Sequence, residues 1–357
     1  MTDGRGPGGH EGAPGVPGDD RDLFVGVDVG GSKVAVLVVD RGYAIRGRHT
    51  IPSPVGAPEE AAGHIATAIA AALSSAGAGL ERVAAVGVGV PGRVDPVSGV
   101  VSLAVNLGWH RLALRDRLET LLGVPCAIEN DVRAAAAGII DRRLLGDVAD
   151  FVYLSVGTGI SAGVVLGGQV HRGTRGLAGE IGHIVVDQSG PRCPCGLTGC
   201  LETVAAGPAI ARAAVEAVAA GRQTQLAALD TIEAPDVFAA AAAGDAIATE
   251  IVARAGAALA RAIHALVMTY DVERIVLGGG VSRAGAGLLG PITAELDAMR
   301  AASELAAEIL PPDVVALPPD GADAGSWGGV SIARTLIANQ MQPQRRIEEV
   351  VAREPMA

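Results

Sequence analysis

Residues 180–202 read EIGHIVVDQSGPRCPCGLTGCLE, and they contain three of the four cysteines of the chain together with one histidine. This set offers one imidazole and three thiolates, which zinc accepts in tetrahedral sites. Because four protein ligands would fill the coordination shell, such a zinc would be structural rather than catalytic. The expected ligands are His183, Cys193, Cys195 and Cys200.

Two other interpretations of this segment are weaker. Chance cysteines around a core histidine would not be expected to form the compact pattern H-x9-C-x-C-x4-C. A disulfide is disfavoured because Cys193 and Cys195 are too close in sequence to bridge easily, and nothing else indicates an oxidising compartment. Glu180 and Glu202 bracket the cluster, so a bound metal would also fix where these carboxylates point. We therefore expect the zinc loop to form one wall of a small-molecule site.

The composition limits the classes of protein to consider. The 357 residues suffice for two ordinary domains, and 49% hydrophobic with only 2% aromatic residues predicts a core of small aliphatic side chains. The Gly/Pro-rich residues 1–21 resemble a disordered tail and not a signal peptide, and no uninterrupted apolar run reaches the ~18 residues of a membrane helix. The net charge of −11 argues against nucleic-acid binding. We expect a soluble cytoplasmic protein that works without membrane or nucleic acid.

Two strand–turn–strand units have glycine-rich tips. In the unit at 23–40 the turn follows Asp28 and contains Gly30, Gly31, Ser32 and Lys33; in the unit at 151–168 it contains Gly157, Thr158 and Gly159. Backbone amides in such turns can hold phosphate oxygens, and an adjacent carboxylate can hold Mg²⁺ through water. Either unit alone is explained as well by a simple hairpin. Their shared layout predicts a duplicated architecture in which the two glycine turns face one another.

Other segments add polar groups at strand ends. A strand at 126–129 leads into Asn130, Asp131 and a helix, a position where open α/β sheets bind ligands. Asp131 could instead cap the helix, although Asn130 could take that role. A strand at 274–277 ends in Gly278, Gly279 and Gly280, which allow close backbone approach to a ligand. Further expected elements are a strand at 83–90, a short strand at 314–317, and helices at 58–76, 112–122, 208–220, 235–243, 246–270, from Pro291, and at 325–338.

Together these motifs resemble the ROK family of sugar kinases and repressors, within the actin-like ATPase fold, over about residues 22–338. The resemblance is carried by DVGGSK (28–33), GVGVPGRVD (87–95), NLGW (106–109), END (129–131), VGTG (156–159), EIGH (180–183), CPCGLTGCLE (193–202) and LGGGVS (277–282). It implies a two-domain α/β, ribonuclease H-like fold with an interdomain cleft. The implied parts are domains at 22–140 and 141–324, a zinc loop at 183–200, a closing helix at about 325–340 that joins the first domain, and a charged tail at 341–357.

The resemblance also implies a role for each motif. Asp131 would be the general base that takes a proton from a sugar hydroxyl as it attacks the γ-phosphate of ATP. Asp28 and the 30–33 turn would face Mg²⁺ and the phosphates, with Gly157, Thr158 and Gly159 opposite them, and Gly278–Gly280 would lie against the adenosine. The sugar would be bound by Asn106, Asn130, Asp131, Glu180, His183 and Glu202. The family also implies a homodimer or homotetramer.

Some positions depart from the commonest pattern of this family. They are Ser32, Arg133, Ile139, Ile140, Ser161 and Trp327. None removes a group that the chemistry needs, but the substrate stays open among glucose, fructose, N-acetylmannosamine, N-acetylglucosamine and carbocyclic sugar analogues. A sugar-sensing repressor is disfavoured because only about 22 acidic, Gly/Pro-rich residues precede the first strand. A catalytically silent sugar-binding protein is disfavoured because Asp28, Asp131 and both glycine turns are present.

Overall fold

The first half of the chain forms a five-stranded sheet of order β3-β2-β1-β4-β8. The computed structural model describes residues 21–319 and 322–351, so nearly all of the expected N-terminal tail lies outside the described residues. The first three strands form an antiparallel meander, whereas β4 and β8 continue the sheet in parallel. The strands are β1 (Leu23–Val29), β2 (Lys33–Asp40), β3 (Ile45–Pro52), β4 (Val83–Val90) and β8 (Cys126–Asn130).

The second half repeats this topology in a sheet of order β11-β10-β9-β12-β13. Again the first three strands are antiparallel neighbours and the last two are parallel additions. The shared strand order confirms the duplicated architecture expected from the two glycine-tipped units. The strands are β9 (Phe151–Val156), β10 (Ile160–Leu166), β11 (Gln169–Val170), β12 (Arg274–Gly278) and β13 (Val315–Ala316).

Helices cover both faces of each sheet. On the first sheet, Val25 and Val27 face a core with α1 (Pro58–Ser75) and α2 (Leu114–Leu122), while Phe24 faces α10 (Ala324–Val351). On the second, Val152 and Leu154 face one large core, while Phe151 packs against α3 (Asp131–Asp141). That large core includes helices α4 (Glu202–Ala205), α5 (Gly207–Ala219), α6 (Ala234–Ala242), α7 (Ala246–Tyr270), α8 (Ala286–Ala302) and α9 (Glu304–Ile309).

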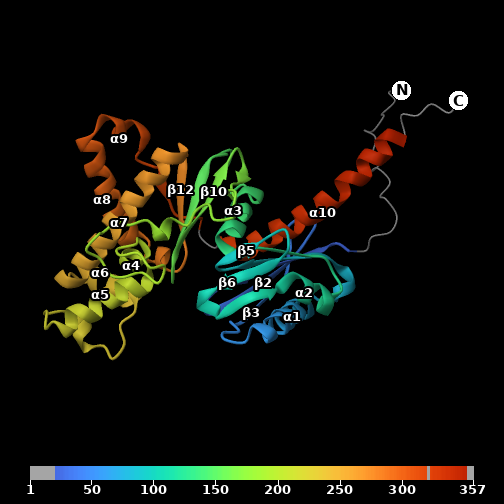
Figure 1. Ribbon diagram of the computed structural model, residues 1–357, viewed down its shortest axis with the longest axis horizontal. Helices are drawn as coiled ribbons and strands as arrows, with labels where there is room; N and C mark the ends of the chain where they lie inside the picture. The colour runs from blue at the N-terminus through green and yellow to red at the C-terminus, as the bar shows by residue number, and fades with distance from the viewer. Residues whose placement is uncertain (1–20, 320–321, 352–357) are drawn as a thin grey trace, which may run out of the picture.

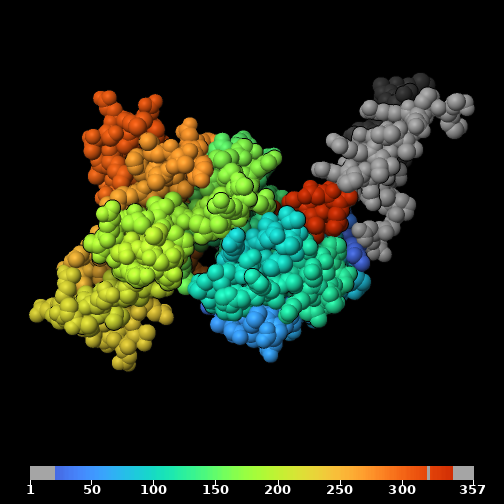
Figure 2. Space-filling model, in the orientation of Figure 1, coloured from blue at the N-terminus to red at the C-terminus, as the bar shows by residue number. Residues whose placement is uncertain are grey.

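The two sheets lie in separate masses that meet at α3 and α10. Figure 1 shows α10 beginning beside α3 at the junction and running outward over the first sheet, with the second sheet on the other side of α3. Figure 2 shows an open notch between the lower parts of the blue-to-cyan and the yellow masses. The helices approach closely because both contribute glycine: a β-carbon at Gly138 would lie 2.6 Å from the backbone nitrogen of Gly328. The proposed domain boundaries at 140 and 324 stay a prediction.

Several boundaries differ from those expected from the sequence. The helix expected to begin at Pro291 begins at Ala286, and Pro291 lies inside it, where its ring packs against Gly256 of α7. The closing helix was expected to end near residue 340, but α10 continues to Val351. The segment 91–113 forms a third, three-stranded sheet of β5 (Arg93–Asp95), β6 (Val100–Ala104) and β7 (Trp109–Ala113), which the sequence did not indicate.

One described helix, α7, is long and apolar enough to cross a membrane by length and hydropathy, and 56% of its apolar window is buried inside the protein. Its buried residues, among them Ala255, Leu259 and Ile263, belong to the large core of the second half. The apolar character of α7 is therefore explained by packing within the protein.

Candidate active site

The four predicted zinc ligands converge in space. The ligand atoms of His183, Cys193, Cys195 and Cys200 all lie within 4.8 Å of one another. Cys193 Sγ is 3.6 Å from His183 Nδ1, and Cys195 Sγ is 3.5 Å from Cys200 Sγ. Zinc with ordinary bond lengths would separate its tetrahedral ligands by about 3.6–3.8 Å. The chemistry and spacing of this donor set therefore fit a structural zinc ion.

The segment before the zinc ligands runs directly against strand β10. A β-carbon at Gly179 would overlap the carbonyl oxygen of Ala162, and one at Gly182 would overlap that of Ile160. The backbone of Ala162 donates to Gly179 O at 2.8 Å, and the hydroxyl of Ser161 reaches the same oxygen at 3.3 Å. The EIGH motif therefore needs its glycine because only a residue without a side chain fits there. This packing fixes Glu180 and His183 relative to the second sheet.

Asp131 occupies the first turn of α3, at the carboxyl end of β8. Asn130 caps this helix, because its side-chain oxygen accepts hydrogen bonds from the backbone of Val132 and Arg133 at 3.1 Å. The amide of Asn130 also donates to Asp131 Oδ1 at 2.9 Å and to Gly92 O at 3.2 Å. Capping is thus done by Asn130, and the carboxylate of Asp131 is left for another role.

The surroundings of Asp131 change its acidity. Loss of hydration raises the pKa of its carboxyl group to about 6, and the negative charge of Glu180 adds to the rise. Hydrogen bonds from the backbone and the positive charge of Arg133 act in the opposite direction. A carboxyl group with a pKa near 6 is ionised at neutral pH yet basic enough to accept a proton.

The three glycine-rich turns come together. A β-carbon at Gly31 would lie 4.0 Å from Thr158 Oγ1, and one at Gly157 would lie 3.6 Å from the backbone nitrogen of Gly280. This confirms the expectation that the turns of the two repeated units face one another. Gly279 has φ +83°, and a β-carbon there would overlap the carbonyl oxygen of Val156. The amides of Gly30 and Gly157 are bonded within their own turns, to Lys33 O at 2.8 Å and Gly159 O at 2.9 Å, so the remaining amides of the three turns are the ones that suit the phosphates of a nucleotide.

Asp28 lies beside the first of these turns, on β1. Loss of hydration raises the pKa of its carboxyl group to about 7, and the charges of Asp131 and Asp323 raise it further, whereas Lys33 lowers it. Asp323 precedes α10 and forms an ion pair with Arg48 at 3.4 Å. Asp323 is not among the residues predicted from the sequence, although an acidic residue directly before the closing helix is a signal that indicates it.

The remaining predicted sugar ligands have different surroundings. Glu202 begins α4 and accepts a hydrogen bond at 3.1 Å from the backbone of Ile160, directly after the GTG turn. Asn106 is exposed in a short 3₁₀ turn (Val105–Leu107), and no hydrogen bond within residues 21–319 and 322–351 joins it to the other sugar-site residues. Its link to them is indirect: Gly92, whose carbonyl oxygen accepts a hydrogen bond from Asn130, lies against Leu103 and Ala104, close in sequence to Asn106.

Two departures from the family pattern are accounted for by packing. Trp327 is 7% exposed in the core beneath the first sheet, where its ring lies 6.2 Å from Tyr43 and under the guanidinium of Arg142. Ile139 is 1% exposed in the core between α3 and the second sheet. Both side chains therefore belong to the interior rather than to the cleft.

Comparisons with known proteins agree with this geometry. The family model described as ROK family matches residues 24–335. A glucokinase of Halalkalibacterium halodurans is 37% identical over 284 residues, covering 77% of this chain and 85% of the relative. An N-acetylmannosamine kinase of Shigella flexneri is 35% identical over 262 residues, covering 73% and 84%. The crystal structure of a ROK family glucokinase from Streptomyces griseus with glucose and AMPPNP has a TM-score of 0.74 and 31% identity, covering 88% of this chain and 99% of that one.

The chain therefore belongs to the ROK family. Within that family it is an enzyme of the sugar-kinase class, with the actin-like ATPase fold of its structural relatives. The resemblance inferred from the motifs is confirmed at the level of family, fold and enzyme class.

Proposed function

We propose that this enzyme transfers the γ-phosphoryl group of ATP to a hydroxyl group of a hexose, with glucose as the first candidate and Asp131 as the general base. The observation that carries the proposal is the position of Asp131. It lies at a strand end, near Asp28 and Glu180, with a pKa of about 6 and without a capping role. The 37% identity to a glucokinase supports the choice of glucose.

The residues divide into three groups by position. Asp131 accepts the proton of the attacking hydroxyl group, which makes that oxygen a better nucleophile. The turns at 30–33 and 157–159 donate backbone hydrogen bonds to the phosphates, and Gly278–Gly280 lie against the adenosine. Around Asp131, the sugar is held by Asn106, Asn130, Glu180, His183 and Glu202, whose carboxylate, amide and imidazole groups suit hydroxyl pairs.

Two metals have separate places in this proposal. Zinc held by His183 Nδ1 and the three cysteines leaves His183 Nε2 available for a sugar hydroxyl group, so the zinc loop shapes the sugar site. The Mg²⁺ that accompanies ATP neutralises phosphate charge when bound. Asp28 suits such an ion because loss of hydration raises its pKa and the nearby carboxylates of Asp131 and Asp323 raise it further, and a cation would relieve both effects.

A second substrate is N-acetylmannosamine, because kinases for that sugar are 34–35% identical to this chain over 72–73% of its length. N-acetylglucosamine, fructose and carbocyclic sugar analogues would use the same base. We expect the enzyme to be cytoplasmic. We also expect it to be a homodimer or homotetramer, and light scattering of the purified protein would determine which.

The deciding experiment is ADP release with ATP and Mg²⁺ over a panel of these sugars, for the wild type and for Asp131→Asn. We expect turnover of glucose by the wild type, and loss of turnover with retained sugar binding in Asp131→Asn. Undiminished turnover by the variant would remove Asp131 as the base. If the enzyme phosphorylates N-acetylmannosamine and not glucose, the proposed substrate changes to N-acetylmannosamine, and the proposed mechanism stays the same.

A further inference from the structure

Next to the proposed base, three charged side chains form a network of ion pairs that has been given no shared role so far: Glu129 and Arg133 are buried, and Arg172 is about half exposed. Glu129 immediately precedes the Asn130–Asp131 pair and is 3% exposed. Its Oε1 accepts hydrogen bonds at 2.9 Å from Arg133 Nε and from the backbone of Asn130, and its Oε2 accepts one at 2.8 Å from Arg172 Nε. A carboxylate this deeply buried needs such partners.

The two arginines come from different parts of the chain. Arg133 belongs to α3 and is itself 3% exposed, whereas Arg172 lies in the segment between β11 and Glu180, with about half of its side chain exposed. Arg133 also donates to the carbonyl oxygen of Gly176 at 2.9 Å, in that same segment. Two separate contacts therefore hold residues 171–179 against the end of β8 and the start of α3.

Residues 171–179 form a compact loop. The backbone of Ala178 donates to Arg172 O at 3.2 Å, and that of Gly176 donates to Gly173 O at 3.3 Å. Gly179 at its end is held against β10, and Glu180 follows immediately. Because this loop is closed by its own hydrogen bonds and held at Arg172 and Gly176, its position restricts where the backbone of Glu180 can lie. The position of Glu180 thus depends on the same carboxylate that orients the backbone of Asn130.

We propose that Glu129, Arg133 and Arg172 form a positioning clamp that holds the loop 171–179, and with it Glu180 and His183, in a fixed relationship to Asp131. The inference rests on the proposed function, in which Glu180 and His183 bind the sugar and Asp131 acts on it. None of the three residues need touch the substrate. They act by holding the sugar ligands at a fixed distance and orientation from the base. Misplacement of catalytic groups by about 1 Å can lower the rate roughly 100-fold.

The presence of arginine at position 133 supports this assignment. A smaller polar residue would leave Glu129 with one guanidinium and would not reach Gly176. Burying Arg133 is also unfavourable in itself, because its Nη2 is buried without a hydrogen-bond partner among the described residues. A buried guanidinium with one unsatisfied nitrogen is better explained by a positioning role than by stability alone.

Arg172→Met is the decisive variant, because Arg172 is half exposed and its loss should leave the fold intact. For whichever sugar of the panel the wild type phosphorylates, we expect the sugar KM to rise roughly 10-fold, with the ATP KM changed less than about twofold. Calorimetric titration of the same sugar without ATP should show a matching loss of affinity. Arg172→Lys, which keeps the charge, should restore part of it.

The control is Arg175→Met, because Arg175 is an exposed arginine of the same loop with no hydrogen bond or ion pair in the described part of the chain. It should bind sugar like the wild type. The clamp is overturned if Arg172→Met keeps wild-type sugar affinity, if both KM values rise together, or if Arg175→Met behaves identically. These outcomes are independent of Asp131→Asn, whose retained turnover would overturn the base and not the clamp.

A double-mutant cycle adds a second readout. If Glu129 and Arg172 act as one unit, Glu129→Gln combined with Arg172→Met should weaken sugar binding no more than the stronger single variant. Additive losses in sugar affinity would mean that the two residues act independently, and the clamp would then be rejected.

Discussion

The carboxylate of Asp28 on β1 lies directly against Gly325 in the first turn of α10. A β-carbon built at Gly325 would be 2.5 Å from Asp28 Cγ and 3.0 Å from Asp28 Oδ1. The closing helix therefore bounds one side of the proposed phosphate site, and a side chain at position 325 would have to displace the carboxylate. This contact joins two segments that are nearly three hundred residues apart in the chain.

We expect Gly325→Ala to lower kcat by at least roughly 10-fold, because Asp28 must move away from the phosphates. The control is Gly63→Ala in α1, where a β-carbon would meet nothing within 4 Å. Alanine there should leave activity unchanged and stabilise the protein by up to about 1 kcal/mol. Steady-state kinetics give kcat for both variants, and thermal melts give their stability. If both variants had the same kcat, the contact between Gly325 and Asp28 would have no part in catalysis.

Asp28→Asn should abolish turnover and yet stabilise the protein above pH 7. Folding raises the pKa of Asp28 to about 7, so the folded state favours the protonated form, and this contribution to stability is lost as the pH rises from about 4 to 7. Asparagine stays neutral throughout. We expect a gain of about 1–3 kcal/mol at pH 8 and little at pH 4, measured by urea unfolding without Mg²⁺.

The comparison for this variant is Asp230→Asn, because Asp230 is exposed. It should show no pH-dependent gain in stability. If the Asp28→Asn protein were no more stable than the wild type at pH 8, the ionised carboxylate of Asp28 would not destabilise the folded state, and its pKa would not be raised by folding.

The pH dependence of turnover should report Asp131. Because its pKa is about 6 in the ligand-free protein, kcat/KM for the sugar should be constant near pH 7.5 and fall about tenfold per pH unit below pH 6, where the base becomes protonated. Glu180 contributes to the rise of this pKa, so Glu180→Gln should move the acid limb to lower pH. A profile that is flat down to pH 5 would exclude a base with this pKa.

Zinc should be present at about one ion per chain, and Cys195→Ser should lose both the metal and most of the sugar affinity. The control is Cys126→Ala, because Cys126 is buried in the first half and is not one of the four clustered ligands. That variant should keep its zinc. Elemental analysis and calorimetric sugar titration measure the result, and a Cys195→Ser protein that kept both properties would separate the metal from the sugar site.

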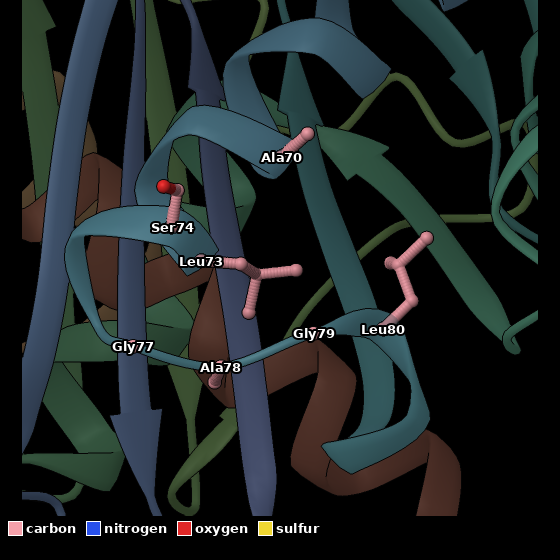
Figure 3. A pocket seen from close by; sticks show the side chains of 7 residues that line it. All are labelled: Ala70, Leu73, Ser74, Gly77, Ala78, Gly79 and Leu80. Carbon is pink, nitrogen blue, oxygen red and sulfur yellow. The ribbon is translucent and has the colours of Figure 1, made fainter.

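A surface groove of about 420 Å³ lies apart from this chemistry, at the end of α1. Figure 3 shows Leu73 and Leu80 pointing into it beside Gly77 and Gly79. None of the predicted site residues lines the groove, and no ionisable side chain does. The proposed catalytic site is therefore inferred from converging polar groups and not from the shape of an apolar groove.

The sequence by itself determined those features that depend on neighbours in the chain. The clustering of His183 with three cysteines, the glycine turns after β1 and β9, and the strand–Asn130–Asp131–helix junction are all local, so spacing and residue type were sufficient to predict them. The long helix α7 and the strand β4 were also predicted with the bounds that the structure has. Local signals failed at Pro291, where proline was taken to begin a helix that already runs from Ala286.

Only the tertiary structure decided which distant groups meet. No local pattern indicates that Glu129 accepts hydrogen bonds from Arg172, that Asp323 lies near Asp28, or that Gly325 bounds its carboxylate. The raised pKa values of Asp28 and Asp131 likewise arise from lost hydration and from charges on other segments. Desolvation and charge–charge interactions depend on distance in space, and distance in space is set by how the two repeated sheets pack around α3 and α10.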